Sequence, residues 1–389
     1  MTTPVCVITN AYPDYEGSYH GIFVRRTVED MAERGWLSHV LAPRIFKQSE
    51  PFQEYPTHTV TRFLFPSAQK LLIEYDPIPV FRISALVASG VFSATRLIVS
   101  RGCRLIHAHW AFPAGLVGLA ASKLTGRKLI LTVHGSDWRL AQDRGGLPQL
   151  LFKRVALGST RIICVSQSIT DYLLRLGLDE KSLVSFPMGV DERIFGKSVR
   201  EQEVPGEREL NIISTRNHLP LYRVKDLLEA ALRLGERTTD FKLTIAGQGS
   251  QSEELKEFCS RRGLGHRVTF TGRVEPEHLA RLLGQHRIYV STSPAEGSSV
   301  SLLEAMACGC LPVVTDIPAN REWITHERNG LLYPAGDRAA LAEQILRAAE
   351  DDKLLQRAKD EGPRIVAQRG LWSAQIEILD SCYQNTLQM

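Results

Sequence analysis

The chain has 389 residues, 43% of them hydrophobic and 23% charged, which is the composition of a soluble globular protein with room for two separate cores. Residues 1–200 hold 24 Lys and Arg against 16 Asp and Glu, so the overall net charge of +4 divides into +8 and −4 for the two halves. A basic amino-terminal half favours an anionic binding partner or an anionic membrane face. The absence of any basic run with interleaved aromatic residues excludes nucleic acid as an expected partner.

The seven cysteines are scattered and lie mostly inside apolar segments. Their odd number and their spacing argue for a reducing compartment and against disulfides or a zinc site. The chain starts as a core strand, without the basic region and cleavage site of a signal peptide. We therefore expect a cytoplasmic protein, and a peripheral position on the inner face of the membrane is left open.

Short apolar strands alternate with helical patterns through the first half of the chain. Strands are expected at residues 5–10, 38–42, 105–109, 129–134 and 161–166, and an amphipathic helix at residues 21–34. The most apolar long segment, residues 83–100, contains Arg96 and several serines. We interpret it as a helix docked on a domain or a membrane surface rather than as a membrane span. The alternation predicts a parallel sheet with right-handed crossovers in residues 1–196.

A polar, charge-rich stretch that contains Pro205 and Gly206 predicts a linker over residues 197–209. A second alternating series follows, with strands expected at residues 210–215, 242–246, 267–270, 288–292 and 311–315. Residues 210–370 are thus expected to form a second doubly wound α/β domain, and residues 371–389 are helical in pattern. Ligands of such domains bind at the carboxyl ends of the parallel strands.

The most specific motif lies between the fourth strand of this second series and the next helix. Glu296 follows the strand, the turn Gly297-Ser298-Ser299 comes next, and Glu304 lies one to two turns into the helix. Unpaired main-chain N–H groups at a helix N-terminus bind anions, and a charge inside an apolar run needs a partner. This spacing fits a sugar, a diphosphate and a ribose laid out in a row.

At these residues the chain resembles the retaining family 4 glycosyltransferases of GT-B fold, and the resemblance covers nearly the whole chain. It implies two Rossmann-like, doubly wound parallel-sheet domains that face a central cleft. Residues 1–196 would bind the acceptor and residues 210–370 the nucleotide sugar, and the C-terminal helix in residues 371–389 would cross back to pack on the first domain. In this family pattern, Glu296 would hold donor sugar hydroxyls and Glu304 the ribose.

The same resemblance places cations after the first strand of the second domain. The family pattern is Gly-Arg-Leu…Lys-Gly-x-Asp-x-Leu, and Arg216 matches its arginine, which would neutralise the leaving diphosphate. Counting back from Asp226 puts Arg223 where the family has its lysine, and Lys225 competes for that role. An arginine can also clamp phosphate, bidentately. Further along, main-chain atoms beside Val274 would meet the nucleotide base.

Several residues of the first half follow expected strands. Gly21, at the start of the first helix, would let the backbone approach a diphosphate closely, while Tyr19 and His20 before it are acceptor candidates. His134 opens a His-Gly-x-Asp sequence that resembles the family motif, and it would contact a donor sugar hydroxyl near the reacting carbon. Asp137 would orient it or bind acceptor hydroxyls.

His109, at the end of the third strand, is left open between packing at the sheet end and contact with the acceptor. No carboxylate nucleophile is evident near His134, so retention would use front-face attack, with the departing phosphate oxygen taking the acceptor proton. The chain has no Asp-x-Asp motif, and metal-independent catalysis is expected. The expected catalytic residues are therefore His134, Glu296 and Arg216.

We thus expect transfer of a sugar from a nucleotide-diphosphate sugar, a UDP-sugar before a GDP-sugar, to a saccharide, lipid-linked or small-molecule acceptor in glycan or glycoconjugate biosynthesis. A nucleotide-sugar epimerase or hydrolase of the same fold, or a non-catalytic sugar-nucleotide binder, are the alternatives. The basic segment 62–104, with Arg62 and Arg96, is the candidate contact for an anionic or membrane-borne acceptor. A packed helix with solvated arginines is the competing interpretation of that segment.

Overall fold

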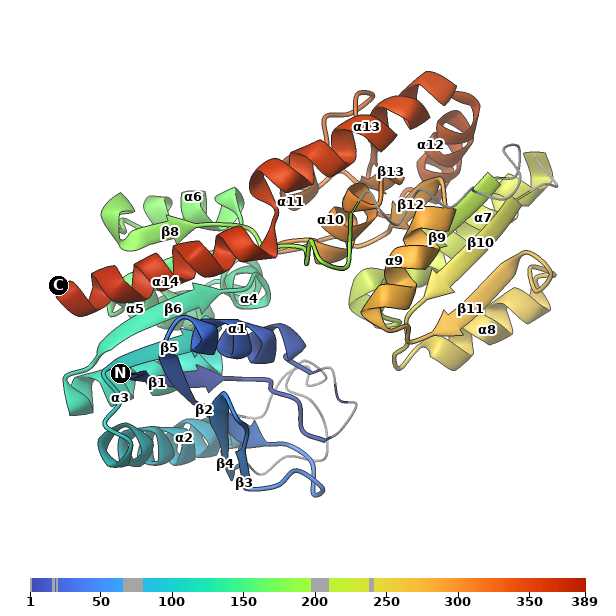
Figure 1. Ribbon diagram of the computed structural model, residues 1–389. Helices are drawn as coiled ribbons and strands as arrows, with labels where there is room; N and C mark the ends of the chain where they lie inside the picture. The colour runs from blue at the N-terminus through green and yellow to red at the C-terminus, as the bar shows by residue number, and fades with distance from the viewer. Residues whose placement is uncertain (1, 16–17, 19, 66–79, 197–209, 238–240) are drawn as a thin grey trace. The chain divides into compact units, whose positions relative to one another are not determined.

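The computed structural model describes residues 2–15, 18, 20–65, 80–196, 210–237 and 241–389 (Figure 1). Their contacts divide the chain into two compact units, Met1–Phe186 together with Ile376–Met389, and Pro187–Gln375. Residues 187–196, which the sequence analysis placed in the first domain, therefore belong to the second unit by their contacts. The expected linker at residues 197–209 lies outside the described residues.

The first unit is built on an eight-stranded sheet with the order β3-β4-β2-β1-β5-β6-β7-β8. Neighbouring strands pair in parallel except β3, which is antiparallel to β4. The five strands expected from the sequence are present, whereas β3, β4 and β8 were not expected. The strands are β1 (Thr3–Thr9), β2 (Trp36–Arg44), β3 (Phe52–Glu54), β4 (His58–Leu64), β5 (Leu105–His109), β6 (Lys128–Val133), β7 (Arg161–Cys164) and β8 (Leu183–Ser185).

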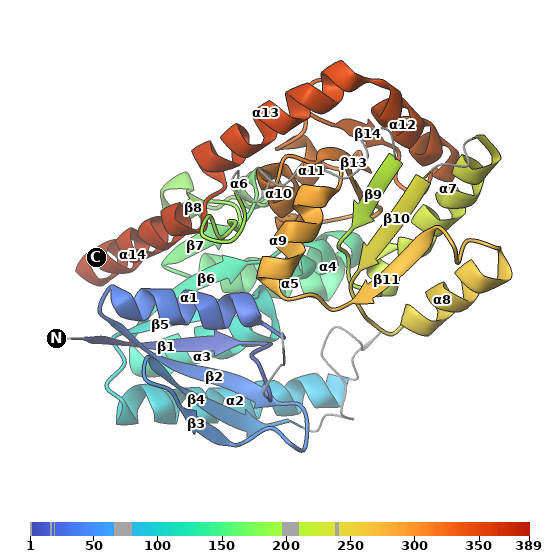
Figure 2. The same cartoon turned by 45° about the vertical axis from the view of Figure 1, so that its right-hand side comes forward.

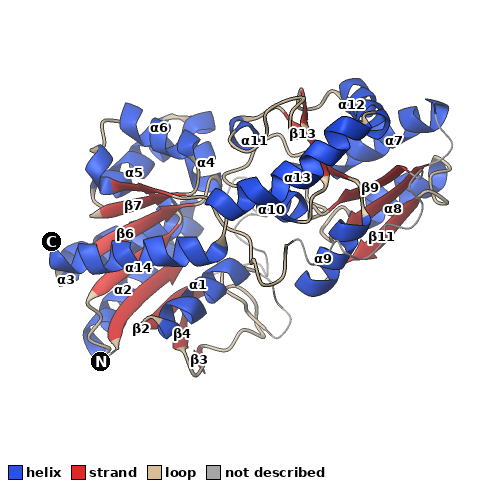
Figure 3. Ribbon diagram, turned by 45° about the horizontal axis from the view of Figure 1, so that its top comes forward, coloured by secondary structure: helices blue, strands red, loops and turns tan. Residues whose placement is uncertain are grey.

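Helices cover both faces of this sheet (Figure 3). The connection through α1 moves along the sheet in one direction, whereas those through α2, α3 and α5 move in the other. Right-handed crossovers therefore place α1 on one face, as Figure 2 shows, and α2, α3 and α5 on the opposite face. The helices are α1 (Ile22–Glu33), α2 (Val80–Ser100), η2 (Ala111–Gly115), α3 (Leu116–Thr125), α4 (Ser136–Arg144), α5 (Gly146–Leu157), α6 (Gln167–Arg175), η3 (Glu180–Ser182) and α14 (Trp372–Gln388).

Helix α2 is the longest helix of the protein that the structure describes. By length and composition its Phe81–Ser100 part would be able to cross a membrane, with a mean hydropathy of 1.6. It packs on β2, β4 and α3, yet only 28% of its most apolar 18-residue stretch is buried. It is therefore a helix of the first unit that leaves much of its apolar surface exposed.

The C-terminal helix α14 belongs to the first unit from Ile376 onward. Trp36 Nε1 donates to Asp380 Oδ1 over 2.7 Å, and the Trp36 and Tyr383 rings meet edge to face at 4.9 Å. Because Trp36 begins β2 and Arg34, at the end of α1, lies 3.8 Å from Asp380, α14 covers the same face of the sheet as α1.

The second unit contains a six-stranded parallel sheet with the order β11-β10-β9-β12-β13-β14. The unit thus repeats the doubly wound α/β arrangement of the first, which confirms the predicted fold class. Its elements are β9 (Leu210–Ser214), η5 (Pro220–Tyr222), α7 (Val224–Arg237), β10 (Phe241–Ala246), α8 (Ser252–Arg261), β11 (Val268–Gly272), α9 (Pro276–Gln285), β12 (Ile288–Ser291), α10 (Val300–Ala307), β13 (Leu311–Thr315), α11 (Pro318–Arg321), β14 (Leu331–Tyr333), α12 (Arg338–Glu350) and α13 (Asp352–Arg369).

Helix α10 is buried on nearly all sides in this unit. Its apolar side chains Leu302, Leu303 and Met306 are fully enclosed in the core between the sheet, α9 and α13. The second unit is joined to the C-terminal helix by a parallel bridge between Val190 and Leu371, where the two chain segments that connect the units run side by side. The dense packing fixes α10, and with it the direction in which its N-terminus points.

Candidate functional site

In each sheet the strand order reverses at one place, and ligands of doubly wound folds bind at the carboxyl ends of the strands there. The reversal lies between β9 and β12 in the second unit and between β1 and β5 in the first. Arg216 follows β9 and Glu296 follows β12, while the loop to Gly21 follows β1 and His109 ends β5. These four candidate residues thus lie at the two reversal points of the sheets.

Arg216 forms an almost fully buried ion pair with Glu296, and the two side chains are 9% and 11% exposed. Its Nη2 donates to Glu296 Oε1 and its Nη1 donates to the Ser301 hydroxyl, while its Cζ lies 4.3 Å from the centroid of the Tyr222 ring. Burial alone would lower the pKa of Arg216, but Glu296 together with Tyr289 and Tyr222 outweighs this effect and raises that pKa, so the arginine stays charged. Among the described residues its buried Nε has no hydrogen-bond partner.

The N-terminus of α10 lies beside this pair and presents main-chain donors. Within the described parts of the chain, no acceptor is found for the N–H groups of Gly297, Ser298 and Ser299. Ser299 is the N-cap residue, and its buried hydroxyl also has no partner there, whereas Ser298 Oγ accepts from Met188 N over 3.2 Å. Glu304, the fifth residue of α10, is half-buried. Unpaired donors and the helix dipole make this end suited to an anion.

Arg223, like Arg216, lies between β9 and α7. Its backbone is left-handed (φ 51°) just before α7, and its Nε is 2.7 Å from Asp226 Oδ2. The preceding residue, Tyr222, stacks on Arg216, and its carbonyl accepts a 2.8 Å hydrogen bond from Thr292 at the end of β12. The chain at Arg223 is therefore anchored to both strands of the reversal point.

Lys225 is directed toward a different part of the unit. Its Nζ lies 2.9 Å from Glu254 Oε1 on α8 and 5.7 Å from the Phe258 ring centroid. Both contacts are on α8, which follows β10 rather than β9 or β12. The structure thus separates the two cations that the sequence left as alternatives.

Two glycines after β10 let that loop lie against the loop that carries Arg216. A Cβ on Gly247 would come within 2.4 Å of the Arg216 carbonyl oxygen, and one on Gly249 equally close to that of His218. The glycine motif thus fixes backbone at the carboxyl edge of the sheet. Val274 follows β11, which β10 separates from β9.

Three histidines stack in the first unit near the carboxyl ends of β5 and β6. His109 Nδ1 lies 3.0 Å from His134 Nε2, and the His107 and His109 ring centroids are 4.2 Å apart. His107 contacts the hydroxyls of Tyr383 at 2.6 Å and Thr132 at 2.7 Å. Burial lowers the pKa of His109 to about 3, and burial together with the neighbouring histidines lowers the pKa of His107 and His134 well below the ordinary value. All three rings are therefore neutral at pH 7.

Aromatic rings enclose His134 on its other sides. The ring centroid of Phe23, on α1, is 5.0 Å from that of His134, and the Trp110 centroid is 4.5 Å away. His109, which is buried, supplies the hydrogen bond that orients this ring. The sequence analysis left its role open, and the structure places it in the packing at the sheet end.

Asp137 is buried and binds main-chain groups. Its Oδ2 accepts from Ala111 N over 2.7 Å and its Oδ1 from Gly135 N over 3.0 Å. Burial raises the pKa of Asp137, and these hydrogen bonds partly oppose that change. The carboxylate thus ties the turn that follows His134 to the segment that follows β5.

The loop after β1 ends at Gly21, the N-cap of α1, whose φ is 69°. A Cβ on this residue would lie 2.2 Å from the Ala11 carbonyl oxygen, so the loop can close against itself because the residue is glycine. His20 Nδ1 lies 3.4 Å from the Ser18 hydroxyl, and its ring stacks on Phe46 at 6.1 Å. The other acceptor candidate of the loop, Tyr19, lies outside the described residues.

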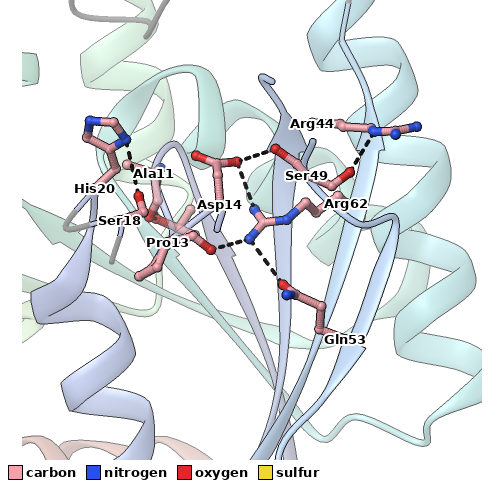
Figure 4. Close-up of polar contacts among 10 residues, drawn as sticks. Ala11, Pro13, Asp14, Ser18, His20, Arg44, Ser49, Gln53 and Arg62 are labelled. Atoms are coloured by element: carbon pink, nitrogen blue, oxygen red, sulfur yellow. Dashed lines mark hydrogen bonds and ion pairs between the residues drawn. The ribbon is translucent and has the colours of Figure 1, made fainter. Parts of the chain in front are cut away.

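A buried ion pair anchors this loop to β4 (Figure 4). Arg62 Nη1 lies 3.4 Å from Asp14 Oδ1, with the two side chains 0% and 2% exposed, and its Nη2 donates to the Pro13 carbonyl. Ser49 Oγ donates to the same Asp14 oxygen over 2.9 Å, and Gln53 Oε1 is 3.4 Å from Arg62 Nη2. The expectation that Arg62 is a surface contact for an acceptor or a membrane is therefore wrong, because its side chain points inward from β4.

Two family models match the chain, one in each half. Glycosyltransferase Family 4 matches residues 20–193 and Glycosyl transferases group 1 matches residues 197–364. The chain belongs to the family 4 glycosyltransferases. It is 24% identical over 351 residues to the N-acetyl-alpha-D-glucosaminyl L-malate synthase of Bacillus anthracis, which covers 88% of this chain and 87% of that one.

Solved structures of glycosyltransferases share the fold of this one. Sucrose-phosphate synthase from Thermosynechococcus elongatus superposes with a TM-score of 0.82 at 20% identity, over 98% of each chain. HepE of Anabaena, solved in complex with UDP and glucose, gives a TM-score of 0.72 at 17% identity, over 98% of this chain and 100% of the other. These likenesses confirm the predicted GT-B fold.

The residues that the sequence selected in this glycosyltransferase fall into two groups, one in each unit. In the second unit, Arg216 and Glu296 are in direct contact at the N-terminus of α10, whereas Lys225 and Val274 lie on or beside other strands and helices. In the first unit, His109, His134 and Asp137 lie at or just after the ends of two neighbouring strands. Gly21 is the N-cap of α1, and Phe23 of this helix packs on His134.

Several residues of the site were missed from the sequence. Ser301 and Tyr222 hold Arg216, and Tyr383 from the last helix holds His107. Ser301 could have been found as a second hydroxyl at the helix start.

We predict that Gly21→Ala destabilises the glycosyltransferase more than Gly102→Ala does. The two glycines have similar backbones (φ 69° and 63°), but a Cβ at residue 102 meets nothing within 4 Å. The control should cost about 1 kcal/mol for its left-handed backbone, and Gly21→Ala about 1–3 kcal/mol more for the overlap with Ala11. Chemical denaturation measures both, and equal losses would contradict the close contact.

We also predict that the first unit loses stability as the pH falls from about 7.5 to about 5.5. Below the unfolded histidine pKa of about 6.5, the unfolded chain binds protons that the neutral His107, His109 and His134 do not. Each such histidine contributes up to about 1.4 kcal/mol per pH unit, and the contribution is lost as the pH falls. His109→Gln should flatten the dependence of the unfolding free energy on pH, and an unchanged slope would show that His109 titrates normally.

Proposed function

We propose that the protein is a retaining glycosyltransferase that transfers a sugar from a UDP-sugar to a saccharide or lipid-linked acceptor. The observation that carries this proposal is the buried Arg216–Glu296 pair at the N-terminus of α10. At the reversal point of the second sheet, the pair brings a charged guanidinium next to the main-chain donors at the start of α10. The carboxylates of Glu296 and Glu304 precede and follow these donors in the sequence. HepE, whose structure contains UDP and glucose, supports uridine as the base of the donor.

The second unit is proposed to hold the donor by its diphosphate. Arg216 has an unpaired buried Nε among the described residues, and Gly297, Ser298 and Ser299 offer free N–H groups. A diphosphate at this point would accept these hydrogen bonds and compete with Glu296 for the guanidinium. Once released from the arginine, Glu296 can accept hydrogen bonds from the sugar hydroxyls.

Glu304 is proposed to bind the ribose. It lies on α10 five residues inside the helix, and ionised carboxylates bind a vicinal diol through two charge-assisted hydrogen bonds. Glu304 lies four residues after Val300, the first residue of α10, or roughly 6 Å along the helix axis, which suits a ribose next to a diphosphate.

His134 is proposed as the residue of the first unit that contacts the donor sugar. A neutral imidazole can donate or accept one hydrogen bond at the nitrogen that His109 leaves free. The leaving diphosphate oxygen would take the acceptor proton, and Arg216 would stabilise the charge that develops on it. The protein's own cations and main-chain donors would neutralise that charge, so we propose that a divalent metal is dispensable.

Donor hydrolysis measured with and without glycan acceptors, in EDTA and in Mg²⁺, tests this function. We expect UDP-sugar turnover that is unchanged by EDTA and accelerated by acceptor. Release of the sugar without its transfer to any acceptor would favour a hydrolase or an epimerase. Binding of UDP in a thermal-shift assay without turnover would favour a sugar-nucleotide binder. Product anomers resolved by NMR decide between retention and inversion.

Substitutions at the pair give the second test. Arg216→Ala should lower kcat/KM by about a hundredfold, because the loss of one electrostatic donor to the transition state costs about 3 kcal/mol. Glu304→Gln should mainly raise the KM for the donor, whereas Glu296→Gln should mainly lower kcat, since its proposed contact is nearer the reacting carbon. Equal and small effects of the two glutamine variants would disprove the assignment.

Arg223→Ala should lower kcat/KM for the donor at least about tenfold, whereas Lys225→Ala should leave it within about twofold. The reason is that Arg223 is anchored beside Tyr222 at the reversal point, while Lys225 pairs with Glu254 on α8. Each variant removes one positive charge and one ion pair, so the two are matched. Thermal unfolding of both variants measures how much the loss of the ion pair alone destabilises the protein. A larger loss from Lys225→Ala would assign the second phosphate cation to the lysine.

A further inference from the structure

Large apolar side chains are exposed on one part of the protein. Every such side chain in the described ranges belongs to the first unit, and none is on the second. Seven of them, which are 57–72% exposed, come from the three helices α2, α3 and α5. They are Phe81, Phe92, Val99, Leu124, Leu147, Leu150 and Leu157.

On α2 and α5 these side chains form stripes along the solvent side of the helix. The exposed positions of α2 after its first residue include Phe81, Ala85, Ala88, Phe92 and Val99, at helical spacings of three, four and seven. On α5 the exposed Leu147, Leu150 and Leu157 also recur at helical spacings, of three and seven residues. Each helix is therefore apolar on two sides, one packed on the sheet and one facing out.

The three helices lie next to one another on the face of the sheet opposite α1 and α14. Helix α3 contacts both α2 and α5. A groove between α3 and α5 is lined by Leu119, Lys123, Leu150, Lys153, Arg154 and Leu157, so apolar and cationic side chains share one surface. We call the exposed surface of α2, α3 and α5 the three-helix face.

Every charged residue within the three helices themselves is basic. The helices contain Arg82, Arg96, Lys123, Lys153 and Arg154 and no Asp or Glu. Along the sequence no acidic residue occurs between Asp76 and Asp137. The other face of the sheet is different, because the Arg25–Glu29 pair of α1 and Asp380 of α14 balance their neighbours there.

We propose that the three-helix face binds the surface of an anionic lipid bilayer. Apolar stripes that alternate with cations allow a helix to insert its apolar side chains at the acyl boundary while the cations meet anionic headgroups. A protein partner with an acidic rim would share the charge pattern. A bilayer is favoured because the apolar side chains spread over three helices rather than gathering in one pocket, and a solvated surface rarely exposes so many together. The sequence predicted a membrane contact in segment 62–104. The surface proposed here differs from that prediction, because it excludes the buried Arg62 and adds α3 and α5.

Vesicle flotation of the full-length protein tests the proposal. Equimolar phosphatidylglycerol and phosphatidylcholine vesicles should bind the protein in 0.1 M salt, and phosphatidylcholine vesicles should bind it at least about tenfold less. Binding should weaken strongly at 1 M salt, where the Debye length falls from about 10 Å to about 3 Å. No binding to the anionic vesicles in 0.1 M salt would overturn the proposal.

Variants locate the bound surface. Phe92→Ser, Leu150→Ser and the double variant Lys123→Glu/Arg154→Glu should each reduce binding at least about fivefold. Ile378→Ser on α14 and Lys256→Glu/Arg261→Glu on α8 are matched controls that should bind normally, since neither helix belongs to the three-helix face. Equal losses in the controls, or none in the face variants, would overturn the assignment.

Two further measurements complete the test. Thermal unfolding and donor hydrolysis in detergent-free buffer should match the wild type for every variant, which shows that the altered surface positions do not unfold the protein. Because hydrolysis needs no vesicles, failed vesicle binding leaves the proposed function standing, and failed hydrolysis leaves the lipid surface standing. A wild-type dimer that Leu150→Ser dissociates, without vesicle binding, would replace the bilayer by a second copy of the chain.

Discussion

The buried pair of Arg216 and Glu296 is the constraint on which the second unit depends. A guanidinium with so little access to water must be met by a carboxylate and by hydrogen-bond acceptors, because an unpaired buried charge costs several kcal/mol. The pair therefore fixes how the loops after β9 and β12 run, and Ser301 and Tyr222 complete the shell around it. The close approach of the glycine loop at Gly247 holds the same backbone from the other side.

The first unit handles its buried polar groups in another way. Its three stacked histidines are kept neutral by burial, so that they need hydrogen bonds but no counter-charge. Its buried charged groups include the Arg62–Asp14 pair, which ties the loop after β1 to β4, and Asp137, which accepts hydrogen bonds from main-chain N–H groups. Burial raises the pKa of Asp14 and lowers that of Arg62, while each charge opposes the change in the other. The first unit thus presents a neutral imidazole, His134, and the second a guanidinium that its contacts hold in place, Arg216.

Much of the fold could be predicted because parallel strands of doubly wound sheets are continuous apolar runs. The expected strands at residues 105–109 and 311–315 coincide with β5 and β13, whose residues are all buried. Strand β4 was missed because its Thr59, Thr61 and Arg62 look like surface residues, and the partner that makes Arg62 a buried residue, Asp14, is distant in the sequence.

The site shows the same division between local and distant causes. Sequence spacing placed Glu296 and Glu304 on either side of one helix start, because a strand, a turn and a helix fix their order along the chain. The family resemblance selected Arg216, which the structure brings into contact with Glu296. Sequence spacing was not enough to choose between Arg223 and Lys225. They lie two positions apart, and the direction of each side chain is decided by Asp226 and by Glu254 on another helix. The role of His109 was left open for a similar reason, because its partner His134 follows a different strand, β6.

The C-terminal helix has a consequence for the order in which the protein assembles during synthesis. The second unit, Pro187–Gln375, is one continuous stretch of chain, whereas the first unit also includes Ile376–Met389, which follow the second unit in sequence. Tyr383 must reach His107, and Lys128 Nζ must donate to the Thr386 carbonyl over 3.0 Å, before the α1 side of the first sheet is covered. The half that leaves the ribosome first is therefore the half that finishes folding last.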